Sequence, residues 1–201
     1  NGNMVTTGDY DLNKEPVGVK KGDIVTYTFR IYNEGTIDGY ASEITEDIPE
    51  GLQFLWSEKE GEELKADKKI SDEEKAAIEF NQDRFWTYAD KTLKTVKTDY
   101  LSRDNETIPG DGSNLIKAFG KNDGTKTEKD IDYKEISIML KVISENTTGT
   151  TIRNEACISE DTDKNGNPID DRDSDTEKWV KYEDDEDFDK IVLQSFDLAL
   201  R

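Results

Sequence analysis

Two segments of the chain alternate regularly between apolar and polar side chains, which is the pattern of a β-strand with one buried face. In residues 23–32, DIVTYTFRIY, every second side chain from Val25 onward is apolar, and residues 134–143, KEISIMLKVI, repeat the pattern from Ile136 onward. A glycine precedes the first segment and Asn-Glu-Gly follows it, which is turn chemistry. Such segments predict antiparallel sheets that turn one face toward a core.

Weaker patterns add further strands and one helix. Ser71-Asp-Glu-Glu74 is a capping-box pattern in front of an apolar run, and it predicts a short helix over residues 71–82. Residues 113–119 are expected to form one helical turn. The other expected strands are residues 40–48, 52–56, 84–88, 92–101, 151–159, 191–193 and 196–200. Together these elements predict a mainly β, Ig-like antiparallel β-sandwich with a helix-containing insertion at about residues 57–99.

The composition removes several classes of function. The 201 residues include 47 acidic and 27 basic side chains, a net charge of −20, and no histidine. Without histidine there is no Ser-His-Asp or Cys-His nucleophile system, and the single Cys157 has no partner for an internal disulfide. A strongly negative chain repels phosphate backbones, so we expect no nucleic-acid partner. The apolar runs are too short to cross a bilayer, and no signal peptide is visible.

The negative charge is concentrated near the end of the chain. Residues 160–189 hold 14 acidic and 4 basic side chains, a net of −10, which is half of the total. We interpret residues 160–178 as an acidic loop of a domain that covers residues 1–182. Residues 183–201 are expected to begin with an acidic interdomain joint, because charged linkers extend by self-repulsion.

Three blocks resemble a known family. Residues 22–55 (GDIVTYTFRIYNEGTIDGYASEITEDIPEGLQFL) are similar to the conserved-repeat Ig-like domain of Gram-positive, clostridial-type surface proteins, the family of unknown function numbered eleven. Residues 132–161 resemble the closing strands of that family. The terminal EDDEDFDKIVLQSFDLALR resembles the junction between successive repeats, which implies that residues 183–201 are a joint followed by the first strand of a next repeat. The resemblance implies a stalk or adhesin repeat that holds a functional tip away from the cell wall.

The same resemblance implies an intramolecular Lys–Asn isopeptide bond, assisted by a buried carboxylic acid. Asn154, in IRNEACIS, matches the asparagine of the family. The matching lysine would lie just after Arg201, or before Asn1. The alternative is that Asn154 only forms hydrogen bonds at the end of a strand. The local substitutes for the lysine are Lys14, Lys20 and Lys21.

A second candidate site is a calcium loop in DTDKNGN. Oxygen-bearing side chains at alternate positions, with Gly166 sixth, match the first half of an EF-hand-type loop. Arg172 stands where the loop normally has a bidentate glutamate. The alternative is a solvated acidic hairpin with an Asn-Gly turn. The candidate ligands are Asp161, Asp163, Asn165 and Asn167, with Asp170, Asp171 or Asp173 closing the shell.

We therefore expect a non-catalytic spacer, exported to a bacterial surface, that contacts neighbouring repeats and is stiffened by calcium. One alternative is a module that binds a glycan or host protein through the 57–99 insertion. An exposed groove of Phe85, Trp86 and Tyr88 would favour that alternative. A second alternative is a glycoside hydrolase that uses carboxylates such as Glu46 and Asp47, with Trp56, Trp86 and Trp179 as sugar platforms.

Overall fold

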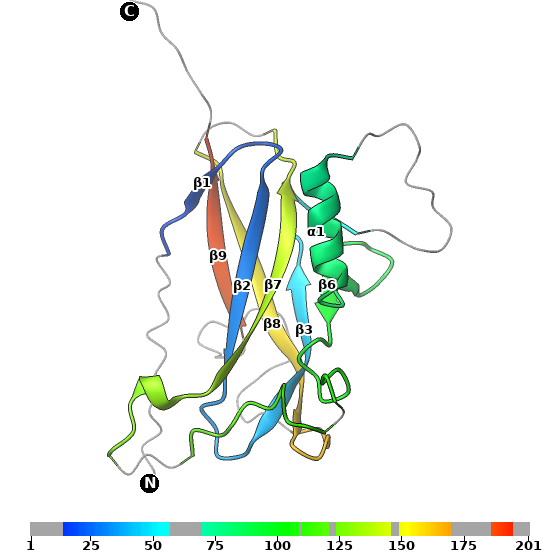
Figure 1. The fold of residues 1–201 in the computed structure, drawn as a ribbon. Coiled ribbons are helices and arrows are strands. Elements are labelled where there is room, and N and C mark those ends of the chain that lie inside the picture. The colour runs from blue at the N-terminus through cyan, green and yellow to red at the C-terminus, as the bar shows by residue number, and fades with distance from the viewer. Residues whose placement is uncertain are drawn as a thin grey trace, which may run out of the picture.

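The chain folds into two packed β-sheets with one helix on the outside (Figure 1). The computed structural model describes residues 14–56, 70–108, 110–120, 124–145, 149–169 and 186–194. The six-stranded sheet runs in the order β1 (Val17–Val19), β9 (Glu186–Leu193), β8 (Thr151–Asp163), β3 (Gly39–Asp47), β6 (Thr95–Thr98) and β5 (Thr87–Tyr88). The three-stranded sheet runs in the order β2 (Ile24–Tyr32), β7 (Tyr133–Val142) and β4 (Leu52–Phe54). Among the strands of these described segments, β1 and β9 alone pair in parallel, so the predicted mainly β, antiparallel sandwich is confirmed.

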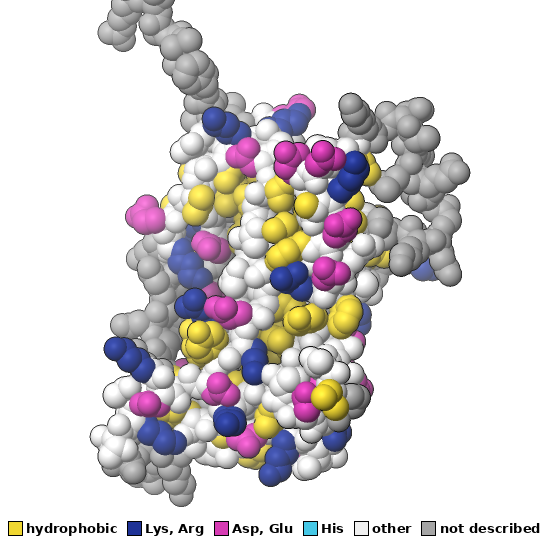
Figure 2. All heavy atoms as spheres, viewed as in Figure 1, with side chains coloured by type: hydrophobic (Ala, Val, Ile, Leu, Met, Phe, Trp, Pro, Cys, Tyr) yellow, Lys and Arg dark blue, Asp and Glu magenta, His cyan; other side chains and the backbone are white. Residues whose placement is uncertain are grey.

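The two alternating segments form the centre of the three-stranded sheet. β2 and β7 pair antiparallel from Ile24 opposite Lys141 to Tyr32 opposite Tyr133. Their alternate side chains enter the core, and the opposite face carries cross-strand polar pairs such as Thr28 with Ser137. Figure 2 shows this side of the molecule, where exposed apolar side chains lie between acidic and basic ones. The inward-facing residues of the pair are Val25, Tyr27, Phe29, Ile31, Ile136, Ile138, Leu140 and Val142.

Helix α1 (Asp72–Gln82) begins at the predicted capping box and covers part of the outer face of the three-stranded sheet. The Ser71 hydroxyl accepts a hydrogen bond from the Glu74 amide, and the Glu74 carboxylate accepts one from the Ser71 amide. Ala77 and Ile78 pack with Met139 on the outside of β7. A short 3-10 turn, η1 (Glu128–Asp130), precedes β7. The helix thus closes a second, smaller apolar cluster on the sandwich.

The predicted insertion is shorter than 57–99. β6 pairs with β3 and β5 pairs with β6, so residues 87–98 extend the six-stranded sheet. Strands were expected at residues 84–88 and 92–101, but because these strands are short and carry no long apolar alternation, the sequence assigned them to the insertion and not to the sandwich. The helical turn expected at residues 113–119 is wrong: Ile116 instead bridges Gly39 in extended conformation.

The domain also continues past residue 182. β9 lies between β1 and β8 and pairs with β8 from Thr151 opposite Val192 to Cys157 opposite Glu186. We therefore correct the interpretation of residues 183–201 as joint and next-repeat strand, at least for residues 186–193. The strand expected at residues 191–193 is the end of β9, where Ile191 and Leu193 reach the core, whereas the surrounding acids hid the strand pattern of residues 186–190. Residues 195–201 lie outside the described residues.

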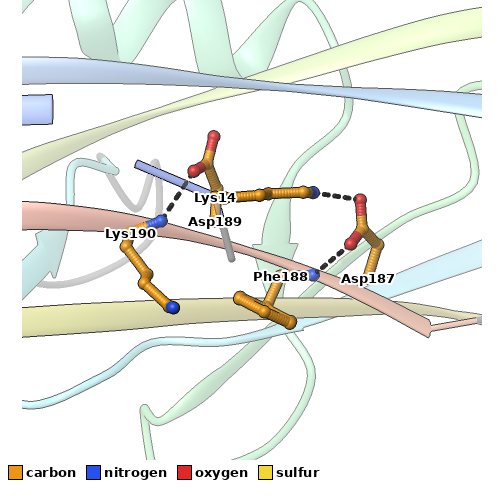
Figure 3. A network of polar contacts seen from close by, with 5 residues as sticks. All are labelled: Lys14, Asp187, Phe188, Asp189 and Lys190. Atoms are coloured by element: carbon orange, nitrogen blue, oxygen red, sulfur yellow. Dashed lines mark hydrogen bonds and ion pairs between the residues drawn. The ribbon is translucent and has the colours of Figure 1, made fainter. Parts of the chain in front are cut away.

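The outer face of β9 shows how a strand this acidic is accommodated (Figure 3). Phe188 is buried beneath cations: Lys14 and Arg153 lie 5.6 Å and 4.1 Å from its ring centre. Lys14 also pairs with Asp187 at 2.5 Å. Cation–π contacts and this ion pair compensate the negative charge around the ring. Within the described residues, no helix is long and apolar enough to cross a membrane.

Candidate functional site

A carboxyl group and a carboxamide meet inside the sandwich. Glu46 on β3 and Asn154 on β8 project from neighbouring strands into the core, where they are 1% and 2% exposed. The Asn154 side-chain nitrogen donates to Glu46 Oε1 across 2.9 Å. Glu46 shares its face of β3 with Ile44, and this parity is the sequence signal that it points inward.

Three polar atoms at this site lack a hydrogen-bond partner among the described residues. They are Oε2 of Glu46, Oδ1 of Asn154 and the hydroxyl of Tyr27, which reaches the interior from β2 on the opposite sheet. A buried polar atom without a partner costs about 1–3 kcal/mol. The Asn154 amide oxygen is an acceptor and the Tyr27 hydroxyl can accept, so two of the three atoms suit an incoming N–H donor.

The electrostatics of the site favour uncharged groups. Burial raises the pKa of Glu46 from 4.5 to about 8, the hydrogen bond from Asn154 opposes that shift, and the charge of Asp47 adds to it. The pKa of the Tyr27 phenol is also raised, mainly by burial and then by the charges of Glu46 and Asp189. At neutral pH the Glu46 carboxyl is therefore protonated and able to donate a proton.

A cavity of about 440 Å³ opens at the edge of the sandwich beside Tyr27. It separates β2 from the edge formed by β1 and β9, and its walls are largely apolar with acids at the rim. Asp189 belongs to this rim and lies opposite Asn154 in the β8–β9 register. The lining residues are Val17, Val19, Asp23, Ile24, Val25, Thr26, Tyr27, Asp189, Lys190 and Ile191.

None of the three local lysines is bonded to the pair. Lys14 is held by Asp187 of β9, and Lys21 is held by Glu145. Lys20 is exposed to solvent. The structure thus contains the amide and the acid that the resemblance implies, with each of these lysines directed elsewhere.

The predicted calcium ligands lie at the end of β8 and in the hairpin that follows it. Thr162 bridges Pro168 across the hairpin, and Gly166 adopts a φ of 84° in the turn. The Asp163 carboxylate accepts hydrogen bonds from the backbone amides and the side-chain nitrogens of Asn165 and Asn167. These bonds, led by those from Asn167, lower the pKa of Asp163 to about 2.

The hairpin therefore uses its central carboxylate to hold its own turn. Among the described residues, no group of three or more acidic, cysteine or histidine side chains is placed to hold a metal ion. Asp161 lies on β8 beside the hairpin, and Asp173 lies outside the described residues. The geometry is that of the hairpin with an Asn-Gly turn, the alternative considered from the sequence.

The aromatic residues of the insertion do not share one surface. Trp86 is fully buried, and its ring nitrogen donates to the Ser137 carbonyl at 2.9 Å. Tyr88 is half-buried and packs edge-to-face against Trp56. Phe85 alone of the three expected groove residues is largely exposed, at 45%. The groove expected for a ligand-binding module is therefore not formed by these three rings.

The two carboxylates considered for glycoside hydrolysis also point apart. Glu46 is in the core, whereas Asp47 accepts a hydrogen bond from Thr95. Successive side chains of a strand project to opposite faces, so the two cannot flank one substrate bond. Trp179, the third proposed sugar platform, lies outside the described residues.

Scans of the chain against protein-family models, curated protein sequences and solved structures gave no match.

Proposed function

We propose that the chain is a non-catalytic repeat of a Gram-positive-type surface protein, in which it acts as a rigid spacer between neighbouring repeats. In this proposal the sandwich is exported and is held together by a Lys–Asn isopeptide bond at Asn154. The single observation that carries the proposal is the buried contact of Asn154 with Glu46, whose remaining oxygen atoms have no described partner.

The chemistry needs three groups, and the described residues supply two. A neutral lysine amine attacks the side-chain carbonyl carbon of Asn154, a new C–N bond forms, and ammonia leaves. Glu46 is protonated at neutral pH because its pKa is raised to about 8, so it can protonate the developing oxyanion and assist the departure of ammonia. Burial also keeps the incoming amine uncharged and nucleophilic.

The open cavity is the route by which we propose that the lysine arrives. Tyr27 and Asp189 line the cavity, and Asp189 lies opposite Asn154 in the β8–β9 register, so the cavity opens beside the strand position of Asn154. The resemblance places the lysine on a strand that precedes the repeat, directly after an Asp-Leu-Ala-Leu-Arg sequence. Residues 197–201 have that sequence, so a preceding copy joined through one lysine supplies the strand.

The test is a tandem of two copies joined by a single lysine residue. We expect its intact mass to be lower than the sequence mass by one ammonia. Replacing the joining lysine by arginine, or Asn154→Ala in the second copy, should restore the full mass, and Glu46→Gln should slow or abolish the loss. Asp47→Asn is the matched control on the opposite face of β3. A tandem that retains its full mass would refute the cross-link.

Calcium stiffening is the part of the proposal that depends on residues 161–173. Calorimetry on the chelator-treated chain should detect calcium binding if Asp173 or its neighbours complete a shell with Asp161. Because Asp163 is already bonded to Asn165 and Asn167, calcium would have to displace those contacts. Absence of binding heat at millimolar calcium would mean that the hairpin is held by its own hydrogen bonds without calcium, and calcium stiffening would then be dropped from the proposal.

One exposed aromatic pair favours the second candidate function, a module that binds a glycan or host protein. The rings of Phe85 and Tyr100 lie 5.6 Å apart and are 45% and 36% exposed. Aromatic faces of this kind stack on sugars and on apolar side chains. Binding to immobilised glycans that is lost in Phe85→Ala, with the fold intact, would support this function.

A further inference from the structure

We propose that the free edge of β2 accepts one more β-strand, and that this strand is residues 195–201 of a second copy of the chain. The resulting contact is head-to-tail and non-covalent. It rests on the open edge and the cavity, and not on the cross-link chemistry, because the segment SFDLALR contains no lysine.

The first observation is the edge itself. β2 is nine residues long and pairs with β7 on one side, while no strand among the described residues pairs with the other side. Its sequence, IVTYTFRIY, contains neither proline nor glycine and only one charged residue, Arg30. Natural proteins cover or blunt long edge strands because the unpaired N–H and C=O groups recruit other strands. Among the described residues, Arg30 is the single charge on this edge and no strand covers it.

The second observation is the space beside the edge. The cavity runs along residues 23–27 of β2 and continues to β1 and β9. Its apolar lining includes Val17, Val25 and Ile191, which require apolar side chains from whatever fills it. A strand added to β2 would place every second side chain in this cavity and would cover Tyr27, whose hydroxyl lacks a described partner.

The third observation is the pattern of the terminal segment. In SFDLALR, Phe196, Leu198 and Leu200 occupy one face of an extended strand, and the other face carries Asp197 and Arg201. One apolar and one polar face match a position between a cavity and solvent. Seven extended residues span about 23 Å, which fits within the nine-residue edge of β2.

The rim of the cavity carries acids, and the segment ends in a cation. Asp23 and Asp189 are exposed at the rim, and Arg201 is the only basic residue in the segment. The lining also includes Lys190 and the segment also carries Asp197, so the charges on both sides are mixed and the docking relies on the apolar fit. Two whole copies repel each other, since each carries a charge of −20, so we expect the association to strengthen as salt screens that repulsion.

The segment is better placed for a second copy than for its own edge. Gln194 is anchored at the end of β1, where its amide donates to the Val19 carbonyl at 2.8 Å. β1 continues directly through residues 20–23 into β2, and this connection is fixed by the bond from the Gly22 amide to the Val142 carbonyl. The connection arches over the end of the sandwich between the two strands (Figure 1). A segment leaving residue 194 would have to cross it to reach its own β2 edge.

A contact between the terminal segment of one copy and the β2 edge of another uses two different surfaces. Such a heterologous contact does not close on itself unless the rotation happens to form a ring, and otherwise it propagates into open chains. The proposal therefore predicts a concentration-dependent mass that rises beyond that of a dimer.

The experiment measures the mass of the full chain by light scattering over a hundredfold range of concentration, under reducing conditions that exclude a Cys157 disulfide. We expect the mass to increase with concentration and with salt. Leu198→Pro removes a backbone donor from the segment and should weaken association at least tenfold. Ala199→Ser, on the polar face, is the matched control and should associate as the original chain does.

A second measurement keeps the proposal falsifiable if Leu198→Pro changes more than the segment. A synthetic peptide SFDLALR should bind the Leu198→Pro chain with one-to-one stoichiometry and slow hydrogen exchange at the β2 amides. A chain that is monomeric at every concentration and does not bind the peptide would overturn the proposal. If the original chain were monomeric and its β2 amides already exchanged slowly, its own segment would occupy the edge, and a second copy would not. Association that persists in Leu198→Pro would likewise show that the segment does not make the contact.

Discussion

The side-chain nitrogen of Asn154 lies 2.9 Å from Oε1 of Glu46, and both side chains are excluded from solvent. A carboxyl group in a sandwich core is costly, because burial penalises its charged form. One hydrogen bond to a neutral amide does not offset that cost, and two oxygen atoms of the pair have no described partner. Apolar side chains of similar volume would be expected to give a more stable core, so the pair is a candidate for a function other than stability.

Glu46→Gln should stabilise the chain at neutral pH and remove part of its pH dependence. Because the pKa of Glu46 is raised from 4.5 to about 8, the folded protein holds a proton that the unfolded chain releases between these values. The free energy of unfolding should therefore fall with rising pH across this window, by about 1.4 kcal/mol per pH unit at most. Glutamine has no proton to release, so the variant should gain on the order of 2 kcal/mol at neutral pH.

Urea unfolding at several pH values checks this expectation. Glu50→Gln, at an exposed position in the turn before β4, is the matched control and should leave the pH dependence unchanged. An unchanged slope in Glu46→Gln would show that the Glu46 carboxyl is hydrated and ionised in the folded protein.

Trp86→Ala should destabilise the sandwich by about 3–5 kcal/mol, the range for removal of a large buried aromatic side chain. Trp86 is fully buried, and its loss also leaves the Ser137 carbonyl without its indole donor. Trp56→Ala, at a half-buried ring on the edge of the same cluster, should cost less. Thermal unfolding of the two variants measures the difference. Equal, small losses would mean that Trp86 is a surface platform and not part of the core.

Local sequence patterns predicted those elements of the fold that are specified by a short stretch of consecutive residues. The alternation in β2 and β7 and the capping box at Ser71 each specify an element without reference to the rest of the chain. β9 escaped prediction in part because its apolar positions are embedded in acids, and Phe188 is buried only because Lys14 and Arg153 lie over its ring. That contact depends on pairing between distant segments.

The candidate site was half predictable for the same reason. Asn154 was found through its sequence block, whereas its partner Glu46 lies 108 positions away and is brought to it by the β3–β8 register. A bulge between Ala41 and Ile44 shifts that register, and no local sequence pattern in β3 predicts the bulge. The calcium interpretation failed to anticipate that Asp163 would accept bonds from its own hairpin, because ligand spacing and turn spacing are the same in DTDKNGN.

Phe85→Gly should not destabilise the chain, although it removes an aromatic ring. Phe85 has a φ of 56° in the turn after α1, a left-handed conformation that costs a residue with a side chain about 1 kcal/mol and costs glycine almost nothing. Its ring is 45% exposed, so the contact with Tyr100 contributes little to offset that strain. Thermal unfolding should show an unchanged or higher midpoint. Phe85→Ala keeps the strain and loses the ring, so it is the control, and its midpoint should lie below that of Phe85→Gly.

Asn81→Ala should be among the most destabilising substitutions in the helix. The Asn81 side-chain nitrogen donates to the carbonyls of Leu55 and Met139, at 3.0 Å and 2.9 Å, and its oxygen accepts from the Met139 amide at 2.8 Å. This fully buried side chain therefore fastens the end of α1 to β7 and to the segment after β4. Alanine would leave three backbone groups without a partner, at a cost on the order of 3–5 kcal/mol.

Two further substitutions in the helix separate the loss of the Asn81 hydrogen bonds from a change in helix propensity. Glu79→Ala changes an exposed position in the same turn and should alter stability by less than about 0.5 kcal/mol. Asn81→Asp keeps the acceptor for Met139 but loses both donors and sets a charge against two carbonyls, so it should be at least as damaging as alanine. Hydrogen exchange at the Met139 amide reports the bond directly. If Asn81→Ala left that exchange slow and the unfolding free energy unchanged, the helix would be held by Ala77 and Ile78 alone.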